Sequence, residues 1–239
     1  MQRWTGSGAV GLLVFLGLLF PAAPSTASQW EWEIGLYAWL ATQSGTVTSA
    51  LDTLDVQDLT ESTNFSMAVH FEAASPKLTW IGDIYYVSWD AKPVTADSVS
   101  TGLELDQWVF EGSAAYRLAE PIEVLASGRV YTLQALLNQG SLQSRESDEI
   151  WADFFVGARA SGTVKEKWLL SLRGDVGAGS SNFSWFANAF AGYQLAGDFQ
   201  LGLSYRLLSV DYESGSGDDF FGWDVIQQGF GIYLGRAYN

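Results

Sequence analysis

From Trp30 onward, apolar and polar residues alternate along most of the chain. Between Phe65 and Glu72, for example, every second residue is large and apolar, and small or polar residues such as Ala68 and His70 stand between them. Such alternation is typical of β-strands with two different faces, because successive side chains of a strand point to opposite sides. The pattern therefore predicts an all-β protein.

Turn-forming residues divide this region into ten segments, at residues 30–40, 64–74, 78–90, 102–118, 122–136, 149–162, 167–179, 182–195, 199–212 and 223–236. The short connections are 75–77, 119–121, 163–166 and 196–198, and the others, mostly longer and polar, are 41–63, 91–101, 137–148, 180–181 and 213–222. An even strand number, with short turns at one end and longer loops at the other, is typical of outer-membrane barrels. The sequence predicts a transmembrane antiparallel up-and-down β-barrel of ten strands, with eight strands as the alternative.

The first part of the chain has a different pattern. Residues 1–8 carry one basic side chain, Arg3, and residues 9–20 form an uncharged apolar run that is followed by Pro21 and small residues. The run is shorter than the roughly 20 residues of a membrane-spanning helix, and 25–27 are small residues suited to a cleavage site. We therefore expect a cleaved signal peptide at 1–27 and one barrel domain at 28–239, with an uncleaved anchor helix as the alternative.

The tryptophans distinguish the membrane barrel from a soluble β-sandwich or a lipocalin-like barrel, in which the apolar face would point inward. They lie near the predicted strand ends, in one group near the short turns and another near the longer loops. Such groups are expected as aromatic girdles at the two interfaces of a bilayer. The predicted girdle consists of Trp30, Trp32, Trp39, Trp80, Trp89, Trp108, Trp151, Trp168, Trp185 and Trp223.

Four segments, at 35–47, 67–90, 151–160 and 171–213, carry a family resemblance. The segments GLYAWLATQSGTV and WADFFVGARA are two of them. They resemble an uncharacterised family of small proteobacterial and cyanobacterial outer-membrane β-barrel proteins. The resemblance covers almost all of the predicted mature chain and implies the fold and the location in a Gram-negative outer membrane, but no catalytic residues.

The end of the chain carries a predicted insertion signal. Outer-membrane barrels usually end in an aromatic residue that the barrel insertion machinery recognises, whereas here Asn239 follows Tyr238. Tyr238 keeps the alternation of the last apolar residues, so we expect the signal to consist of Phe230, Ile232, Leu234 and Tyr238.

Composition and charge exclude several classes of partner and chemistry. The chain has 12 Lys and Arg against 27 Asp and Glu, a net charge of −15, and no cysteine. An acidic chain of this kind has no basic surface that could follow a phosphate backbone, so no nucleic acid is expected as a partner. Without cysteine there are no disulfides, no thiol catalysis and no thiolate metal ligands.

The remaining candidate chemistry is limited because there is a single histidine, His70, with Glu72 and Asp83 as predicted neighbours. A catalytic histidine must lie beside a nucleophile or water, close to the substrate. His70 is predicted near a short turn, away from surface lipids and peptides, so we expect a hydrogen-bonded interior histidine, no catalytic residue and no cofactor. No metal site is expected either, because a structural zinc site needs four ligands.

Acidic loops are the other candidate for ion binding. Asp52, Asp55 and Asp58 in the first loop, and Asp218 and Asp219 in the last, lack the glycine and the closing glutamate of an EF-hand. We expect solvated loops that attract divalent cations and so bridge to lipopolysaccharide phosphates. The first loop, 41–63, could also close the barrel mouth or bind a partner outside it.

The polar face of the predicted strands holds six acids and five arginines besides the histidine. Both signs in nearly equal number favour a paired network in a filled barrel, because a selective pore usually carries one dominant charge and unpaired interior ions are costly. Bulky residues on the same face narrow the interior further: Tyr37, Tyr85, Tyr131, Phe155, Phe186 and Phe190. The predicted network comprises His70, Glu72, Asp83, Glu111, Arg117, Glu123, Arg129, Asp153, Arg159, Arg173, Asp175 and Arg206.

Together these features predict a non-enzymatic outer-membrane barrel with a structural or surface-interaction role and at most a narrow pore. Its expected partners are outer-membrane lipid, lipopolysaccharide and the insertion machinery. A porin-like channel for small solutes, an outer-membrane enzyme acting on lipid A or surface peptides, and a periplasmic lipocalin-like carrier are the alternatives.

Overall fold

The computed structural model describes residues 30–49, 53–55, 62–96, 99–139 and 143–238. The predicted signal peptide at 1–27, together with Asp52, Asp58 and Asn239, lies outside the described residues.

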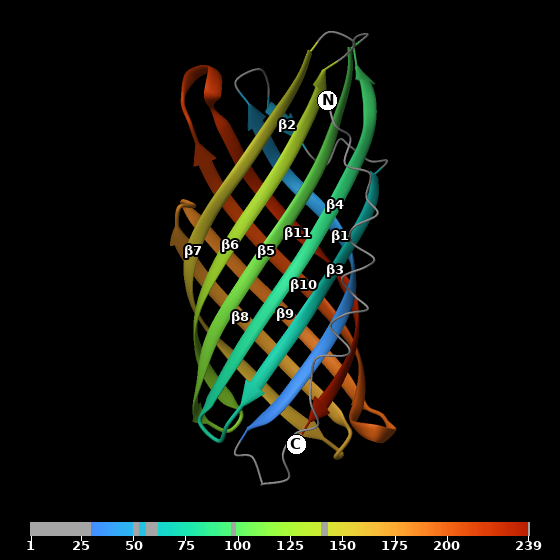
Figure 1. Ribbon diagram of the computed structural model, residues 1–239, viewed down its shortest axis with the longest axis vertical. Helices are drawn as coiled ribbons and strands as arrows, with labels where there is room; N and C mark the ends of the chain where they lie inside the picture. The colour runs from blue at the N-terminus through green and yellow to red at the C-terminus, as the bar shows by residue number, and fades with distance from the viewer. Residues whose placement is uncertain (1–29, 50–52, 56–61, 97–98, 140–142, 239) are drawn as a thin grey trace.

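The described chain forms one antiparallel sheet that closes on itself (Figure 1). The strands are β1 (Glu31–Ser49), β2 (Thr53–Asp55), β3 (Ser62–Ala74), β4 (Leu78–Ala96), β5 (Val99–Ala119), β6 (Ile122–Gln139), β7 (Gln143–Val164), β8 (Trp168–Gly179), β9 (Phe183–Gln194), β10 (Phe199–Ser214) and β11 (Phe221–Tyr238). Two short 3₁₀ turns lie at Ala196–Asp198 and Gly217–Asp219. Each long strand pairs with its neighbour in sequence, and β11 pairs with β1.

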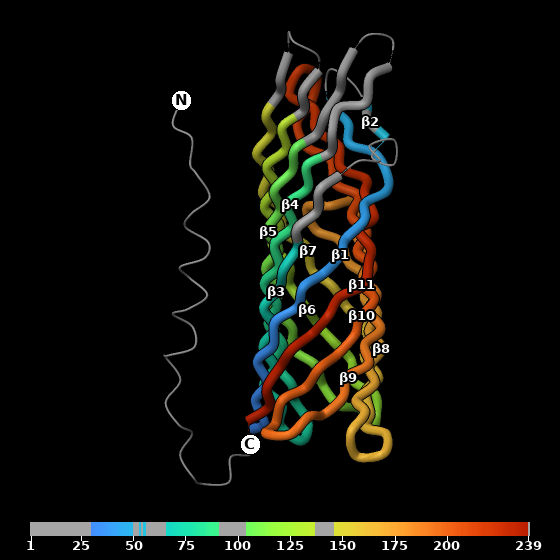
Figure 2. Tube along the Cα trace, turned by 90° about the vertical axis from the view of Figure 1, so that its right-hand side faces the viewer, coloured from blue at the N-terminus to red at the C-terminus, as the bar shows by residue number. Residues whose placement is uncertain are grey.

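Ten long strands therefore make the wall, and the predicted ten-stranded up-and-down barrel is confirmed. The three-residue strand β2 only adds to the end of β1, where Leu54 pairs with Val47. Figure 2 shows β1 and β11 side by side along the height of the barrel, so that the wall has no open edge on this side.

The apolar face of the alternating strands points outward. Leu40, Ile150 and Phe154 are each more than 70% exposed, and many further large apolar side chains are exposed on the outward strand faces. A soluble protein rarely exposes a continuous apolar surface of this extent, whereas a closed barrel needs one because lipid surrounds it. With the backbone of neighbouring strands hydrogen-bonded within the wall, this surface spans a membrane. Among the described residues, there is no helix of the length and hydropathy needed to cross a bilayer.

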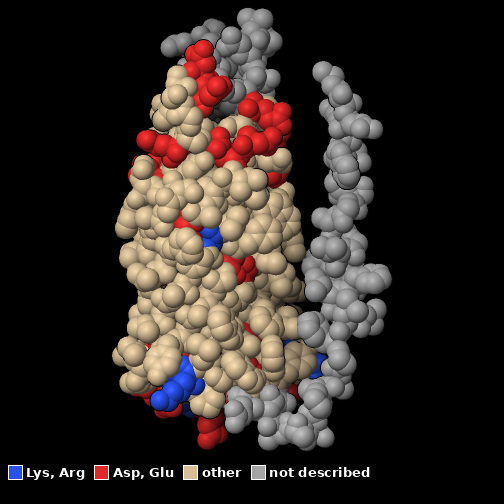
Figure 3. Space-filling view, turned by 60° about the vertical axis from the view of Figure 1, so that its left-hand side comes forward, with Lys and Arg blue, Asp and Glu red and all other residues tan. Residues whose placement is uncertain are grey.

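Figure 3 shows how charge is distributed along the barrel axis. On the face that it draws, most Asp and Glu gather at the end with the longer connections, Lys and Arg lie mainly at the opposite end together with a few acids, and a largely uncharged belt separates the two ends. The end that carries the short connections, between β3 and β4, β5 and β6, β7 and β8, and β9 and β10, is named the turn end here. The opposite end is named the loop end.

Several strands are longer than the sequence pattern predicts. The predicted loop 41–63 is wrong over its first part, because β1 continues to Ser49 and pairs with Phe221 of β11. The predicted loops 91–101 and 137–148 are likewise mostly strand, and β7 alone has 22 residues. Beyond the apolar belt both faces of a strand are polar, so the alternation disappears although the backbone hydrogen bonding continues.

The wall is lower at β8 and β9, which have 12 residues each. Their hairpin ends at mid-height in Figure 1, and β8 pairs with β7 only over Asp153 to Val164. The part of β7 before Asp153 therefore pairs with β6 alone.

The turn between β7 and β8 is tight. Lys165 and Glu166 both have positive φ, at 51° and 60°, and the Lys167 N–H donates to the Val164 carbonyl oxygen at 3.4 Å. Two consecutive positive φ values are the geometry of a type I′ turn, whose twist matches that of the strands it joins.

Candidate functional site in the barrel interior

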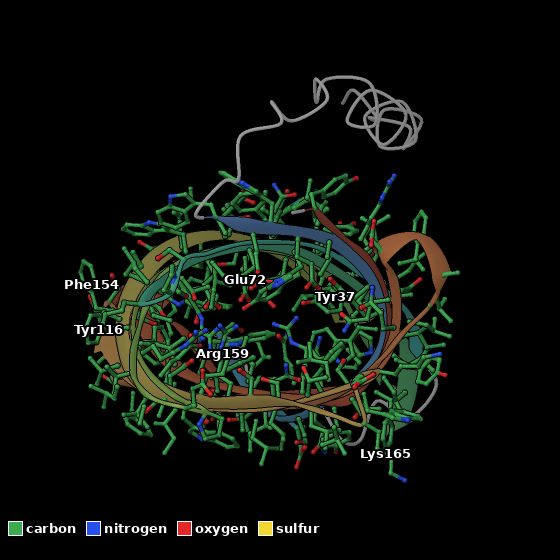
Figure 4. The ribbon with its side chains drawn as sticks, turned by 90° about the horizontal axis from the view of Figure 1, so that it is seen from below. Tyr37, Glu72, Tyr116, Phe154, Arg159 and Lys165 are labelled. Carbon is green, nitrogen blue, oxygen red and sulfur yellow. The ribbon has the colours of Figure 1, made fainter. Side chains whose placement is uncertain are left out.

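The polar face of the strands lines the interior, where side chains form three layers at increasing distance from the turn end. A cavity lies nearest the turn end, a group of arginines and carboxylates follows, and an apolar group lies towards the loop end. The first is named the lower cavity, the second the arginine layer and the third the apolar layer. Figure 4 looks into the barrel from the turn end and shows Tyr37, Glu72 and Arg159 pointing inward, whereas Tyr116 and Phe154 point outward.

The lower cavity has a volume of about 160 Å³. One part of its wall is an ion-pair cluster around Arg159, whose two terminal nitrogens donate to the Glu72 carboxylate at 2.6 and 3.0 Å. The Nε of Arg159 donates to Glu123 at 2.8 Å, and Arg117 reaches the same carboxylate at 3.4 Å. Arg159 on β7 and Glu72 on β3 belong to strands that are not neighbours, so this cluster ties opposite parts of the wall together.

His70 lies on the same wall between two carboxylates. Its Nδ1 is 3.0 Å from Asp83 Oδ1, and its Nε2 is 3.7 Å from Glu72 Oε2. The edges of the Tyr37 and Tyr233 rings flank the imidazole. Because both imidazole nitrogens face carboxylates, the ring is held within the ion-pair network rather than beside a hydroxyl nucleophile.

The arginine layer is built on Arg129, whose side chain is fully buried. Its Nε donates to Glu111 at 2.8 Å, and its Nη2 donates to both oxygens of Asp175, at 2.8 and 3.1 Å. Arg173 donates to the same two carboxylates, so two arginines and two acids form a closed group. The guanidinium of Arg129 also lies 4.0 Å from the centre of the Phe155 ring, where a cation–π contact adds to the ion pairs.

The apolar layer lies between the arginine layer and a second cavity of about 240 Å³ at the loop end, whose wall includes Val47, Ala135 and Phe221. Its larger side chains, all at most 3% exposed, include Trp89, Leu105, Leu133, Trp151, Leu208, Val210, Trp223 and Val225. Trp151 stacks between Tyr131 and Tyr212, with ring centres 4.9 and 4.4 Å apart. Gln227 Nε2 donates to Gln107 Oε1 at 2.7 Å inside the same region. Of these residues only Tyr131 is among the bulky side chains predicted to face inward, although the others share the strand face of the predicted charged residues.

The aromatic girdle is only partly where the sequence predicts it. Trp32, Trp80, Trp108 and Trp168 lie on the outer surface, Trp185 is half-buried on the outward strand face, and Trp30 is half-buried. Trp39, Trp89, Trp151 and Trp223 are instead buried inside the barrel, so their assignment to the girdle is wrong. Closeness to a loop does not decide which face of the strand a residue occupies, and these four share the inward face.

Two members of the predicted charge network have no ion pair within the described part of the chain. Asp153 accepts hydrogen bonds from the Ser181 N–H at 2.9 Å and its hydroxyl at 2.6 Å, and thus holds the β8–β9 connection. Arg206 is buried, lines the lower cavity and has no carboxylate within ion-pair distance among the described residues. Asn188, Glu33 and Tyr233 also line the cavity and were not predicted, although each lies on the inward face of its strand.

The remaining predicted residues lie at the surface. Phe230, Ile232, Leu234 and Tyr238 all face outward and are between 43 and 62% exposed. Asp55, Asp218 and Asp219 are exposed at the loop end, where further exposed acids gather, including Asp90, Glu104, Asp106, Glu146, Asp148, Glu213 and Asp224. Within the described ranges, no group of three or more His, Asp and Glu side chains is arranged to hold a metal ion.

No protein-family model and no curated protein matches the chain. Similar solved structures include the attachment invasion locus protein Ail of Yersinia pestis, with 9% identity over 87% of this chain and 98% of that one and a TM-score of 0.42. Neisserial surface protein A has 13% identity over 89% and 99%, with a TM-score of 0.34. The transport unit of the Escherichia coli autotransporter AIDA-I has 11% identity over 96% of both chains, with a TM-score of 0.42.

The location follows from the barrel's own geometry. A closed antiparallel wall with an apolar outer belt is the form in which β-proteins span bacterial outer membranes. The chain is a β-barrel protein of the outer membrane of a Gram-negative bacterium, and by the same rule its turn end faces the periplasm and its loop end the outside.

Proposed function

We propose that this outer-membrane barrel is closed to solutes and acts as a non-enzymatic structural or surface-interaction protein. The apolar layer is the observation that carries this proposal. Its side chains come from several strands and pack against one another inside the barrel, and Leu133, Leu208 and Trp223 are each only 1% exposed. A hydrophobic constriction excludes water even where it is wider than an ion.

The arginine layer supports the same proposal. In a selective pore, charged side chains at the constriction face the passing solute. Arg129 and Arg173 instead have Glu111 and Asp175 as partners, and the two carboxylates are at most 1% exposed. Charges paired in this way hold the wall together and present little to a solute.

The position of His70 supports a non-enzymatic role. A hydrolase of the outer membrane needs a base beside a nucleophile near the outer surface, where its substrates lie. His70 lies in the lower cavity, on the periplasmic side of the arginine and apolar layers, and both of its nitrogens face acids. The outer half of the described barrel contains no histidine, since the chain has only this one.

The outer surface is where we place the partners. The belt would contact lipid, and the outward residues of β11 that end in Tyr238 would present the insertion signal to the assembly machinery. We also propose that the acids of the loop end bind divalent cations that bridge to lipopolysaccharide phosphates, and that the chain belongs to the uncharacterised barrel family that its sequence resembles. In vesicles containing lipopolysaccharide, EDTA should then lower the melting temperature, and it should have no effect in phosphatidylcholine vesicles.

Single-channel recording in a planar bilayer tests whether the barrel is closed to solutes. The refolded protein, shown to be folded by heat-modifiable migration on a gel, should give no stable current steps, while a porin refolded in the same way serves as the positive control. Reproducible steps from the folded protein would refute the closed barrel and favour a small-solute channel.

A further inference from the structure

Arg206 is the feature of the interior that the closed barrel leaves unexplained. It lies on β10, faces inward and is only 6% exposed, and it forms part of the wall of the lower cavity. In the register of the sheet it is directly opposite Asn188 of β9, which lines the same cavity.

The other buried arginines of the interior all have carboxylate partners. Arg129 and Arg173 share Glu111 and Asp175, and Arg159 holds Glu72 and Glu123. Arg206 has no hydrogen-bond acceptor and no ion pair within the part of the chain that the structure describes, and its Nε is buried without a partner.

Ring faces surround the Arg206 guanidinium instead. Its central carbon is 4.5 Å from the centre of the Tyr85 ring, 5.2 Å from that of Phe186 and 5.3 Å from that of Trp39. Such contacts attract a cation, but they leave its N–H donors without acceptors. A buried guanidinium without a counter-charge is costly, since its desolvation is not repaid by an ion pair.

The acids on the cavity wall are already engaged. Glu72 accepts from Arg159, Asp83 faces the His70 Nδ1, and Glu33 accepts from the Tyr233 hydroxyl. Each has a nearby donor of its own, and among the described residues none lies within ion-pair distance of Arg206. A counter-charge in direct contact with Arg206 would therefore come from outside the protein.

We infer that the lower cavity is a binding site for a small carboxylate that enters from the periplasmic side and pairs with Arg206. The planar fork of a guanidinium matches the two oxygens of a carboxylate, and such bidentate pairs are the strong form of this interaction. The cavity of about 160 Å³ is far larger than one ordered water needs, and the rings of Tyr37, Phe190 and Tyr233 give it apolar surface for a short hydrocarbon chain.

Asn188 would supply the second polar contact. Its Oδ1 is buried without a partner, and its side chain lies beside Arg206 on the neighbouring strand. Because a carboxylate only accepts hydrogen bonds, Asn188 would contact it through its Nδ2 donor, and this contact would orient the ligand rather than attract it.

Calorimetric titration of the protein in detergent micelles with propionate tests this inference. Propionamide has the same shape without the charge, and Arg206→Met keeps most of the side-chain volume without the guanidinium. Arg236→Met is the matched control, because Arg236 lies near the turn end on the outer surface, beside Phe199 and Tyr238. We expect saturable propionate binding that weakens at least about tenfold in Arg206→Met, equivalent to about 1.4 kcal/mol, and is unchanged in Arg236→Met.

Three results would overturn the inference: no saturable propionate binding, propionamide binding as tight as propionate, or chloride competing as well as propionate at equal concentration. If Arg206→Met fails to show heat-modifiable migration, Asn188→Leu replaces it, and unchanged binding in that variant counts against the site. This test is independent of whether the barrel is closed to solutes. A barrel that gives no current steps can still bind propionate, and a barrel that conducts can lack the binding site.

Discussion

Arg129 offers the most direct test of how the interior is held together. In Arg129→Met, Glu111 and Asp175 would both remain, with Arg173 as their only cation. One negative charge would then be left uncompensated at a place where the carboxylates are at most 1% exposed. Breaking a buried ion pair in this way costs about 3–5 kcal/mol, and the lost contact with the Phe155 ring adds about 0.5–2 kcal/mol.

A second substitution separates charge from packing. In Arg129→Met/Asp175→Asn one cation again faces one carboxylate, so the double variant should recover at least about 2 kcal/mol of the loss. The free energy of unfolding is measured by urea titration in phospholipid vesicles, with the heat-modifiable fraction as the readout. A loss below about 1 kcal/mol in the single variant, or a double variant less stable than the single one, would refute the paired-charge explanation.

Three further perturbations test other parts of the structure. Replacing Leu133, Leu208 and Trp223 together by Ala should open the apolar layer and so raise the rate of current steps in a planar bilayer. The control variant, with Ala at the outward Trp108, Leu201 and Leu203, should show no increase. Equal currents in the two variants would contradict closure by the apolar layer. The double variant Lys165→Asn/Glu166→Gly places residues that accept positive φ at both turn positions, so it should raise the free energy of unfolding by about 0.5–1 kcal/mol. Lys167→Asn is the control, because position 167 has no positive φ and should give no gain. A loss of stability in the double variant would argue against the type I′ turn. Gly35→Ala places a methyl group against the Tyr233 ring, so it should lower the free energy of unfolding in urea by about 1–3 kcal/mol. In Gly112→Ala the methyl group meets open space, so this control should be nearly neutral. Similar losses of stability in both variants would exclude overlap with the ring as the cause.

Which face of a strand the charged residues occupy could be predicted from the sequence, because the alternation continues through the apolar belt. That is why Glu111, Arg129 and Asp175 were expected inside the barrel, where the structure brings them together. His70 lies beside Glu72 and Asp83, as predicted. Which charges pair across the interior could not be predicted, because it depends on the stagger of the closed sheet. Arg159 reaches Glu72 across the interior although 87 positions separate them in sequence.

Two other features could not be predicted from the alternation of apolar and polar residues, for physical reasons. Strands that rise above the lipid need no apolar face, so the end of β1 towards Ser49 gave no alternating signal. An inward tryptophan and a lipid-facing one also look alike when judged by their distance from a loop. Trp32 and Trp39 are an odd number of positions apart on the same strand, so their side chains lie on opposite faces. This spacing, rather than the distance from a loop, explains why Trp39 is buried inside the barrel and Trp32 is exposed outside.

The pairing of β11 with β1 closes the barrel with the contact that is most distant in sequence. The other long strands pair with their neighbours in sequence, so their hairpins can assemble locally, whereas Trp32 must find Tyr238 near the far end of the chain. Contacts between such distant positions form slowly. Until β11 is in place, β1 and β10 each expose a row of backbone N–H and C=O groups that hydrocarbon cannot satisfy. A barrel without β11 would therefore leave both rows unpaired in hydrocarbon, so the pairing of β11 with β1 is what allows the wall to sit in a bilayer.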